Sequence, residues 1–85
     1  MDIQEIQNRI TPIISKYLPD EVKVEDITPE KDILKDLQIN SAYLIDIVIA
    51  IEEEFDIAID DDSIGKINTV QEAMEVIVGK INEAA

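Results

Sequence analysis

The chain has 85 residues, 46% of them hydrophobic, which predicts a single domain over residues 1–85 with enough apolar side chains for a core. Cysteine and histidine are both absent, which excludes disulfides, Cys/His metal sites, a cysteine nucleophile and a Ser–His dyad. The net charge of −13, from 20 acidic and seven basic residues, disfavours binding to nucleic acid or anionic membranes and favours partners with basic patches.

An apolar stripe at helical spacing predicts a first helix from Asp2 to Tyr17. Acidic side chains favour the positive end of a helix dipole, so Asp2 and Glu5 suit its N-terminus. Pro12 lies inside this pattern and removes one backbone donor, and because the stripe continues beyond it we expect a kink in the helix there. The stripe consists of Ile3, Ile6, Ile10, Ile13, Ile14 and Tyr17.

A long connector is predicted from Leu18 to Asn40. Within it, Thr28 followed by Pro29 indicates a short turn of helix, with threonine as the cap and proline at the first helical position. Structureless connectors of this length are uncommon in compact domains, which suggests a functional reason for this one. Four apolar residues are expected to hold the connector against the core, namely Ile33, Leu34, Leu37 and Ile39.

The second predicted helix, from Ser41 to Phe55, has two apolar faces. Its core stripe consists of Leu44, Ile47, Val48, Ile51 and Phe55. At about 100° per residue, Ile45 and Ile49 lie on a different side, with Ala42 beside them. This second face is framed by Asp46, Glu52 and Glu53. Apolar residues ringed by charge favour a docking surface, and the alternative is that they pack beneath the connector.

Two further helices complete the predicted fold. A short helix is expected from Asp61 to Lys66, capped by acidic residues at 60–62, and the last helix begins with a capping box from Thr69 to Glu72. The last helix has an apolar stripe made of Val70, Ala73, Met74, Ile77, Val78 and Ile81. The run 57–59 has no partner strand and is expected to cross the core as a link. The prediction is an all-α, small four-helix bundle with three main helices, one short helix and a long first connector.

Acidic residues are concentrated in one part of the chain. No lysine or arginine lies between Lys35 and Lys66, whereas nine acidic residues do. These are Asp36, Asp46, Glu52, Glu53, Glu54, Asp56, Asp60, Asp61 and Asp62. The negative charges of these residues repel one another and so lower the stability of the fold. Because the chain retains them despite this cost, a role in steering partners is favoured. The run at 60–62 fails as a calcium loop, because Ile64 and Gln71 stand at ligand positions, so helix capping is expected there.

Serine is scarce, and only Ser15, Ser41 and Ser63 are present. Ser41 lies where the long connector meets the second helix. On its own this position indicates a helix cap, since Asn40 and Ser41 are both good capping residues. No pair of nucleophile and base is present, and acids on an exposed helix are usually a solvated face, so we do not expect an enzyme.

Several runs around and after the second helix follow one pattern. They are Leu37-Gln38-Ile39-Asn40-Ser41-Ala42, then residues 45–55 ending in Glu52-Glu53-Glu54-Phe55, then residues 57–61 and 66–70. Together these runs resemble the signature of the acyl carrier protein family. The resemblance covers nearly the whole chain, and its more specific part is the Glu-Glu-Glu-Phe run at its distance from Ser41.

The resemblance implies a bundle that carries acyl groups as thioesters on a 4'-phosphopantetheine arm at Ser41. The implied partners are a phosphopantetheinyl transferase, which attaches the arm from coenzyme A, and acyl-transferring enzymes with basic patches. By the same resemblance, Ile45 and Ile49 match apolar contact positions, and Ile59 matches a position near the arm. The docking residues predicted in this way are Ile45, Asp46, Ile49, Glu52, Glu53, Ile59 and Asp61.

The chain departs from the family pattern near Ser41. The family usually reads Asp-Ser-Leu there, whereas this chain has Asn40 and Ala42 on either side of the serine. Gln38 stands where glycine is common, and Tyr43 stands where an acid is common. These departures favour a specialised carrier over one for housekeeping fatty-acid synthesis.

We therefore predict a carrier for a fatty-acid, polyketide or lipid-modification pathway. The alternatives are an unmodified acidic interaction module of the same fold and an acidic ion-binding bundle. The N-terminus lacks the layout of a secretory signal, and the longest apolar run, Ile47–Ile51, is far too short to span a membrane. We expect a cytoplasmic monomer that does not insert into membranes.

Overall fold

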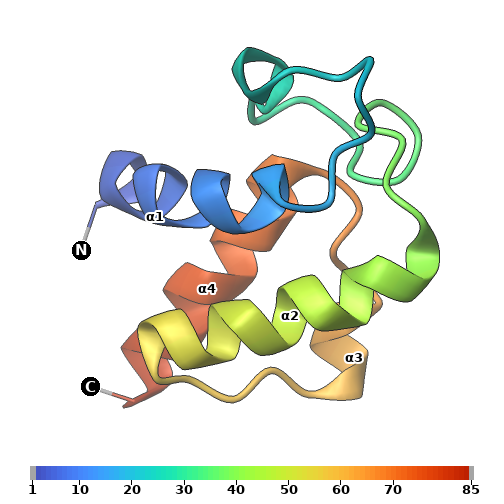
Figure 1. The fold of residues 1–85 in the computed structure, drawn as a ribbon. Helices are drawn as coiled ribbons and strands as arrows, with labels where there is room; N and C mark the ends of the chain where they lie inside the picture. The colour runs from blue at the N-terminus through green and yellow to red at the C-terminus, as the bar shows by residue number, and fades with distance from the viewer. Residues whose placement is uncertain (1, 85) are drawn as a thin grey trace.

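The computed structural model describes residues 2–84, and for residue 84 it describes the backbone only. In chain order it contains α1 (Ile3–Ser15), the 3₁₀ helix η1 (Val24–Asp26), α2 (Ser41–Phe55), α3 (Asp61–Ile64) and α4 (Val70–Ala84) (Figure 1). No β-strand occurs within residues 2–84. The predicted all-α fold with three main helices and one short helix is confirmed.

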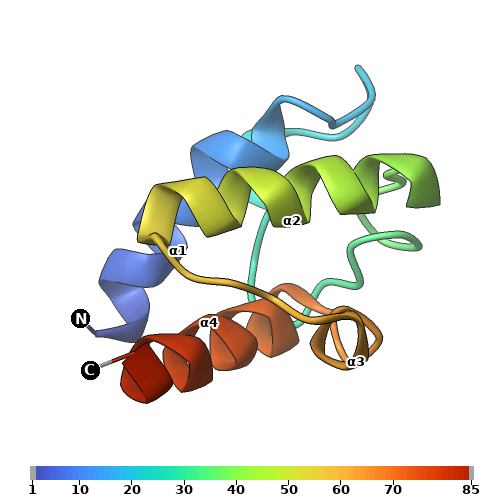
Figure 2. The same ribbon diagram turned by 90° about the horizontal axis from the view of Figure 1, so that it is seen from below.

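The three long helices enclose one core, and α1 packs against both α2 and α4. The long connector between α1 and α2 runs over the end of the bundle where α2 begins (Figures 1 and 2). Both views also place α3 at the level of the N-terminal half of α2. Among the described residues, no helix has both the length and the apolar character that crossing a membrane requires.

The core is almost entirely aliphatic, and no buried polar or charged side chain occurs within the described part of the chain. The long helices contribute Ile6, Ile10, Ile14, Ile47, Val48, Ile51, Val70, Ala73, Met74 and Ile77 to it. The predicted stripes supply these residues, but their outermost members do not reach the centre. Ile3 is 45% exposed, and Leu44 and Phe55 are only half-buried.

The first helix begins as predicted and ends earlier. The Asp2 carboxylate accepts a hydrogen bond from the Glu5 N–H at 2.8 Å, which caps the N-terminus. The helix continues through Pro12 but stops at Ser15 rather than at Tyr17. In its last turn the Ser15 hydroxyl donates to the Pro12 carbonyl at 2.9 Å. Tyr17 is therefore free of the helix and lies near the start of α2.

The connector contains a helical turn, but not where the sequence predicts it. Residues 28–31 form a simple turn, in which the Lys31 N–H donates to the Thr28 carbonyl at 3.1 Å. The helical turn lies upstream at Val24–Asp26, because the Asp26 carboxylate reaches back to the Lys23 N–H at 3.0 Å. The prediction of a helix start at Thr28 is thus wrong, since a side-chain cap acts at another position.

The connector is fixed to the bundle by apolar contacts and backbone hydrogen bonds. Ile33, Leu37 and Ile39 are buried as predicted, whereas Leu34 is 38% exposed and does not join them. The Ile33 N–H donates to the Asn68 carbonyl at 2.8 Å. The Val70 N–H donates to the carbonyl of residue 31 at 3.0 Å. These bonds tie the connector to the first turn of α4, so it is an ordered part of the bundle.

The second half of the chain folds close to the prediction. The capping box is complete, with the Thr69 N–H bonded to the Glu72 carboxylate at 2.9 Å and the Glu72 N–H bonded to the Thr69 hydroxyl at 3.1 Å. The short helix α3 ends at Ile64, before the predicted end at Lys66, and Asp60 caps it. Residues 57–59 form a link without regular secondary structure rather than a strand, as predicted.

Candidate functional site

Asn40 and Ser41 have different structural roles at the start of α2. Asn40 is the N-cap, and its side-chain oxygen accepts a hydrogen bond from the Ala42 N–H at 2.9 Å. Ser41 is the first helical residue, and its side chain is exposed. Within residues 2–84 no group hydrogen-bonds to the Ser41 hydroxyl. The interpretation of Ser41 as the helix cap is therefore wrong, because the preceding asparagine fills that role.

The other two serines have structural tasks. The Ser15 hydroxyl donates to the Pro12 carbonyl at 2.9 Å. The Ser63 hydroxyl donates to the Asp60 carboxylate at 2.8 Å, at the start of α3. Ser41 alone among the three serines combines an exposed side chain with a hydroxyl that bonds to no described group.

The outer face of α2 carries two exposed isoleucines. Ile45 and Ile49 are each 48% exposed, one turn apart on the side turned away from the core. The connector does not cover them, so the alternative in which they pack beneath it is wrong. At 1.5 Å per residue, Ile49 lies about 12 Å along the helix from Ser41 and shares its side of the helix. We call Ser41, Ile45 and Ile49 the outer face of α2.

Acidic residues near this face differ in whether a basic group neutralises them. Glu54 binds Arg9 at 2.8 Å, and Arg9 also lies 4.5 Å from the centroid of the Phe55 ring. Asp46, Glu53 and Asp61 are exposed, and no described basic side chain forms an ion pair with any of them. The fold therefore neutralises Glu54 and leaves three of the predicted docking acids facing solvent.

Two predicted docking residues have structural tasks instead. Ile59 is only 8% exposed and belongs to the core. Its N–H donates to the Glu52 carboxylate at 2.7 Å, which fixes the link from α2 to α3. Glu52 is half-buried for the same reason. The structure thus separates Ile59 from the outer face, and it gives Glu52 a partner within the chain.

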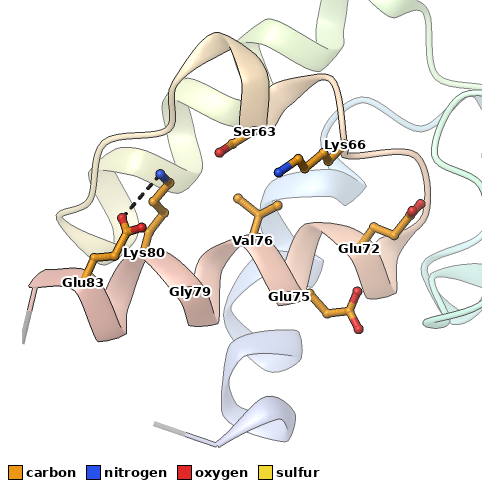
Figure 3. A pocket seen from close by; sticks show the side chains of 8 residues that line it. All are labelled: Ser63, Lys66, Glu72, Glu75, Val76, Gly79, Lys80 and Glu83. Atoms are coloured by element: carbon orange, nitrogen blue, oxygen red, sulfur yellow. Dashed lines mark ion pairs between the residues drawn. The ribbon is translucent and has the colours of Figure 1, made fainter.

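A separate hollow of about 440 Å³ lies between α3 and α4 (Figure 3). Ser63 and Lys66 line it from the α3 side, and Val76, Gly79 and Lys80 line it from α4. It contains neither Ser41 nor the exposed isoleucines. Residues 2–84 contain no group of three or more acidic side chains placed to hold a metal ion.

Lys80 binds Asp60 at 2.8 Å and Glu83 at 3.4 Å, and the second pair is drawn in Figure 3. The hydrogen bond from Lys80, followed by the bond from Ser63, lowers the pKa of Asp60 well below its ordinary value. The bond to Asp60 in turn raises the pKa of Lys80. This ion pair joins the N-terminus of α3 to α4, so the acidic run at 60–62 includes a helix cap and a cross-link.

The start of α2 suits a covalently attached phosphate. The first turn of a helix presents N–H groups and the positive end of the dipole, both of which favour an anion. The first turn of α2 contains no acidic residue. The Ser41 hydroxyl lies at this end of the helix and is exposed, so it is accessible to an incoming phosphoryl group. No carboxylate in the same turn would repel that group.

The sequence and fold match known carriers. Residues 8–77 match the family described as "Phosphopantetheine attachment site". The acyl carrier protein of Buchnera aphidicola is 40% identical over 78 residues, which cover 92% of this chain and 96% of that protein. The acyl carrier protein of Picosynechococcus is 42% identical over 77 residues, covering 91% and 93%. The solved acyl carrier protein from Enterococcus faecalis has a TM-score of 0.76 and 29% identity, covering 94% and 99%.

These matches extend over almost the whole chain and agree with the fold. The helical fold is shared with the Enterococcus structure over nearly the whole of both chains. The family match includes the connector, the start of α2 and the outer face. The chain therefore belongs to the acyl carrier protein family, whose cofactor is 4'-phosphopantetheine.

Proposed function

We propose that Ser41 is the residue to which the phosphopantetheine arm is attached. The observation that carries this proposal is the exposed Ser41 hydroxyl, which bonds to no described group, at the start of α2. Ser15 and Ser63 use their hydroxyls in local structure, which argues against either as the site. Attachment at Ser41 removes no hydrogen bond that holds the helices together.

The proposed attachment is carried out by a phosphopantetheinyl transferase. The Ser41 hydroxyl attacks the phosphorus of coenzyme A that bears the pantetheine. The pyrophosphate bond breaks, adenosine 3',5'-bisphosphate leaves, and the serine proton passes to a base that the transferase supplies. The arm provides the thiol that holds the acyl group, which the chain itself lacks because it has no cysteine. The protein thus needs no catalytic residues of its own, and we propose that it acts as a carrier rather than as an enzyme.

We propose that partner enzymes dock on the outer face of α2. Ile45 and Ile49 provide exposed apolar area beside Ser41, and Asp46, Glu53 and Asp61 provide negative charge without an ion-pair partner among the described residues. An apolar centre with a charged rim is typical of protein interfaces. The complementary surface on the transferase and on acyl-transferring enzymes is an apolar patch surrounded by lysine and arginine.

We further propose that the protein is a specialised, single-domain carrier for a fatty-acid, polyketide or lipid-modification pathway, and that it acts as a monomer in the cytoplasm. The specialisation is inferred from Asn40 and Ala42, which flank Ser41 and are both exposed.

The attachment site is tested by labelling the apo protein with coenzyme A and a broad-specificity transferase. Intact mass should show one added phosphopantetheine on the wild type and none on Ser41→Ala. The matched controls Ser15→Ala and Ser63→Ala should be labelled like the wild type. A labelled Ser41→Ala protein would place the site elsewhere. An unlabelled wild type would favour the alternative of an unmodified interaction module.

A further inference from the structure

A hollow of about 490 Å³ lies between the end of α1 and the start of α2. Its polar side chains are those of Lys16, Tyr17, Gln38, Asn40 and Tyr43, and we call it the tyrosine recess. The two tyrosine rings lie 5.4 Å apart between centroids, with an interplanar angle of 39°. The volume falls within the range of about 300–1,000 Å³ that is usual for small-ligand sites.

The charge of the tyrosine recess differs from that of its surroundings. None of the described residues that line it has a carboxylate, although the chain contains 20 acidic residues. Lys16 is its charged residue. The hollow between α3 and α4 is instead lined by Glu72, Glu75 and Glu83. The recess is therefore suited to a neutral or anionic occupant and unsuited to a basic side chain of a partner.

The tyrosine recess offers hydrogen-bond donors that the fold does not use. The oxygen of Asn40 caps α2, which leaves its amide nitrogen as a donor. No described group accepts a hydrogen bond from that nitrogen, from the Gln38 amide or from the hydroxyls of Tyr17 and Tyr43. These donors match the phosphate oxygens and amide carbonyls of a phosphopantetheine arm. The apolar methyl groups of the arm match the tyrosine rings and the turn at 18–19.

Gln38 adopts a backbone conformation that residues other than glycine rarely adopt, with φ of 57°. Asp56 is the other described non-glycine residue with positive φ, but it lies at the C-terminus of α2, where a left-handed residue is ordinary. Gln38 precedes the N-cap of α2 and places a side chain at the tyrosine recess that glycine would not supply. Strained residues of this kind cluster where ligands are held.

The recess adjoins the proposed attachment site. Asn40, which lines it, is the residue immediately before Ser41. The Cα–Cβ bonds of a helix tilt toward its N-terminus, so the Ser41 side chain leans toward Asn40 and the end of the helix. An arm that starts at Ser41 enters the recess by crossing this one residue. On the α3 side of α2 the arm would instead meet Asp60, Asp61 and Asp62, which repel its phosphodiester.

We propose that the tyrosine recess holds the phosphopantetheine arm on Ser41 against the α1 end of the bundle. The inference rests on the proposed attachment at Ser41. In this position Lys16 faces the phosphodiester, the amides of Gln38 and Asn40 bind carbonyl oxygens of the arm, and the two tyrosine rings pack against its methyl groups. The outer face of α2 stays free for partner enzymes while the arm is docked.

The test is an NMR comparison of the apo and loaded proteins. Loading is first confirmed by intact mass and is expected to be absent in Ser41→Ala. In the loaded protein we expect nuclear Overhauser contacts between the pantoyl methyl protons and the ring protons of Tyr17 and Tyr43. The side-chain amide signals of Gln38 and Asn40 should shift, while the backbone amide signals of Ile59 and Ile64 should not.

Fluorescence gives a second readout of the same recess. The chain has two tyrosines and no tryptophan, so its intrinsic emission comes from the two rings of the recess. Quenching of this emission by acrylamide should be weaker in the loaded protein than in the apo protein. Tyr43→Ala should lose the methyl contacts, and because Tyr43 is 47% exposed, its truncation should leave the bundle folded. The control Val24→Ala, at an exposed residue outside the recess, should keep them.

The outcomes separate the two proposals. A protein loaded at Ser41 whose arm contacts only residues near Ile59 and Ile64, or contacts nothing, would overturn the recess and leave the attachment site intact. A protein that is not loaded at Ser41 would overturn the attachment site, and the recess inference would fail with it. Loading at Ser41 with contacts to both tyrosines, lost in Tyr43→Ala, would support both.

Discussion

Two adjacent residues at the start of α2 allow modification without loss of structure. Asn40 satisfies the Ala42 N–H and starts the helix, while the Ser41 hydroxyl has no bonding task among the described residues. Because the cap precedes the serine, chemistry at Ser41 leaves the first turn intact. The sequence shows that either residue could cap, and only the backbone conformation decides between them.

This division predicts different stability effects at the two positions. Asn40→Ala should lower the free energy of unfolding by about 0.5–2 kcal/mol, as expected when an N-cap is lost. Ser41→Ala should change it by less than about 0.5 kcal/mol, as for an exposed substitution. Urea unfolding followed by circular dichroism measures both values. A larger loss in Ser41→Ala than in Asn40→Ala would contradict the assignment of the cap.

A second residue-scale prediction concerns recognition by the transferase. Asn40→Asp combined with Ala42→Leu should speed modification by a housekeeping-type transferase. The expected gain is roughly 10- to 100-fold, because each tenfold corresponds to about 1.4 kcal/mol of recovered recognition. An aspartate retains the capping oxygen and adds a charge, and Ala42 is exposed, so a leucine fits there. Initial labelling rates at one salt concentration give the comparison, and equal rates would show that neither departure contributes to specialisation.

At the scale of the helix, the periodicity of α2 defines its two faces. The same 3.6-residue repeat that buries Ile47, Val48 and Ile51 places Ile45 and Ile49 on the opposite side. The bounds of α2 and the capping box of α4 follow from local sequence, and the structure confirms both. These features depend on residues within a few positions of one another, so the sequence suffices to predict them.

Because the outer face of α2 is exposed, a mutation there should weaken docking of partner enzymes without lowering the stability of the fold. Ile49→Ala should weaken acyl transfer with partner enzymes while costing little stability. The matched control Ile47→Ala, in the core of the same helix, should cost about 2–5 kcal/mol. Thermal unfolding and transfer assays on both variants make the comparison. A fall in melting temperature for Ile49→Ala as large as that for Ile47→Ala would show that Ile49 is a core residue.

The ion pair between α3 and α4 predicts a specific pH dependence. The pKa of Asp60 is lower in the folded chain than its ordinary value, because Lys80 and then Ser63 bond to its carboxylate. Its stabilising contribution is therefore fully present above about pH 3.9 and is lost as the pH falls through the folded value. Asp60→Asn keeps the capping oxygen but removes the charge, so the variant should be less stable than the wild type at pH 7.

That difference in stability should shrink as the pH falls below about 4, since the Asp60 carboxylate of the unfolded chain then begins to take up a proton while the folded one is still ionised. The control Asp62→Asn removes an exposed acid that has no ion-pair partner within residues 2–84, and it should show no such difference. Urea unfolding at several pH values supplies the data. A gap between Asp60→Asn and the wild type that stays constant down to pH 3 would contradict the role of the ion pair.

Hydrogen bonds and packing that arise only in the folded chain explain where the structure departs from the sequence predictions. Ile59 matches a family position near the arm, and in the fold its N–H donates to the Glu52 carboxylate and its side chain is buried in the core. The connector turns at Asp32, whose carboxylate accepts from the N–H groups of Leu34 and Lys35, and this turn leaves Leu34 facing solvent. The tyrosine recess likewise forms only when Tyr17 and Tyr43 meet in the folded bundle.

For the molecule as a whole, the charge of −13 makes association with basic partners sensitive to salt. Glu53→Lys should slow association with the transferase by roughly tenfold at low ionic strength, because it reverses a charge beside the docking face. Added salt should narrow this gap as the field is screened. The control Glu25→Lys makes the same change in net charge on η1 and should have a smaller effect. Equal effects would mean that total charge, rather than the α2 surface, steers the partner.

Peptide mass spectrometry of the natively isolated protein tests most directly whether Ser41 carries the arm. Trypsin has no cleavage site between Lys35 and Lys66, so one peptide contains both Ser41 and Ser63. This peptide should carry the added mass of one phosphopantetheine, and fragmentation should place that mass on Ser41. A peptide without the added mass, or fragments that place it on Ser63, would contradict attachment at Ser41.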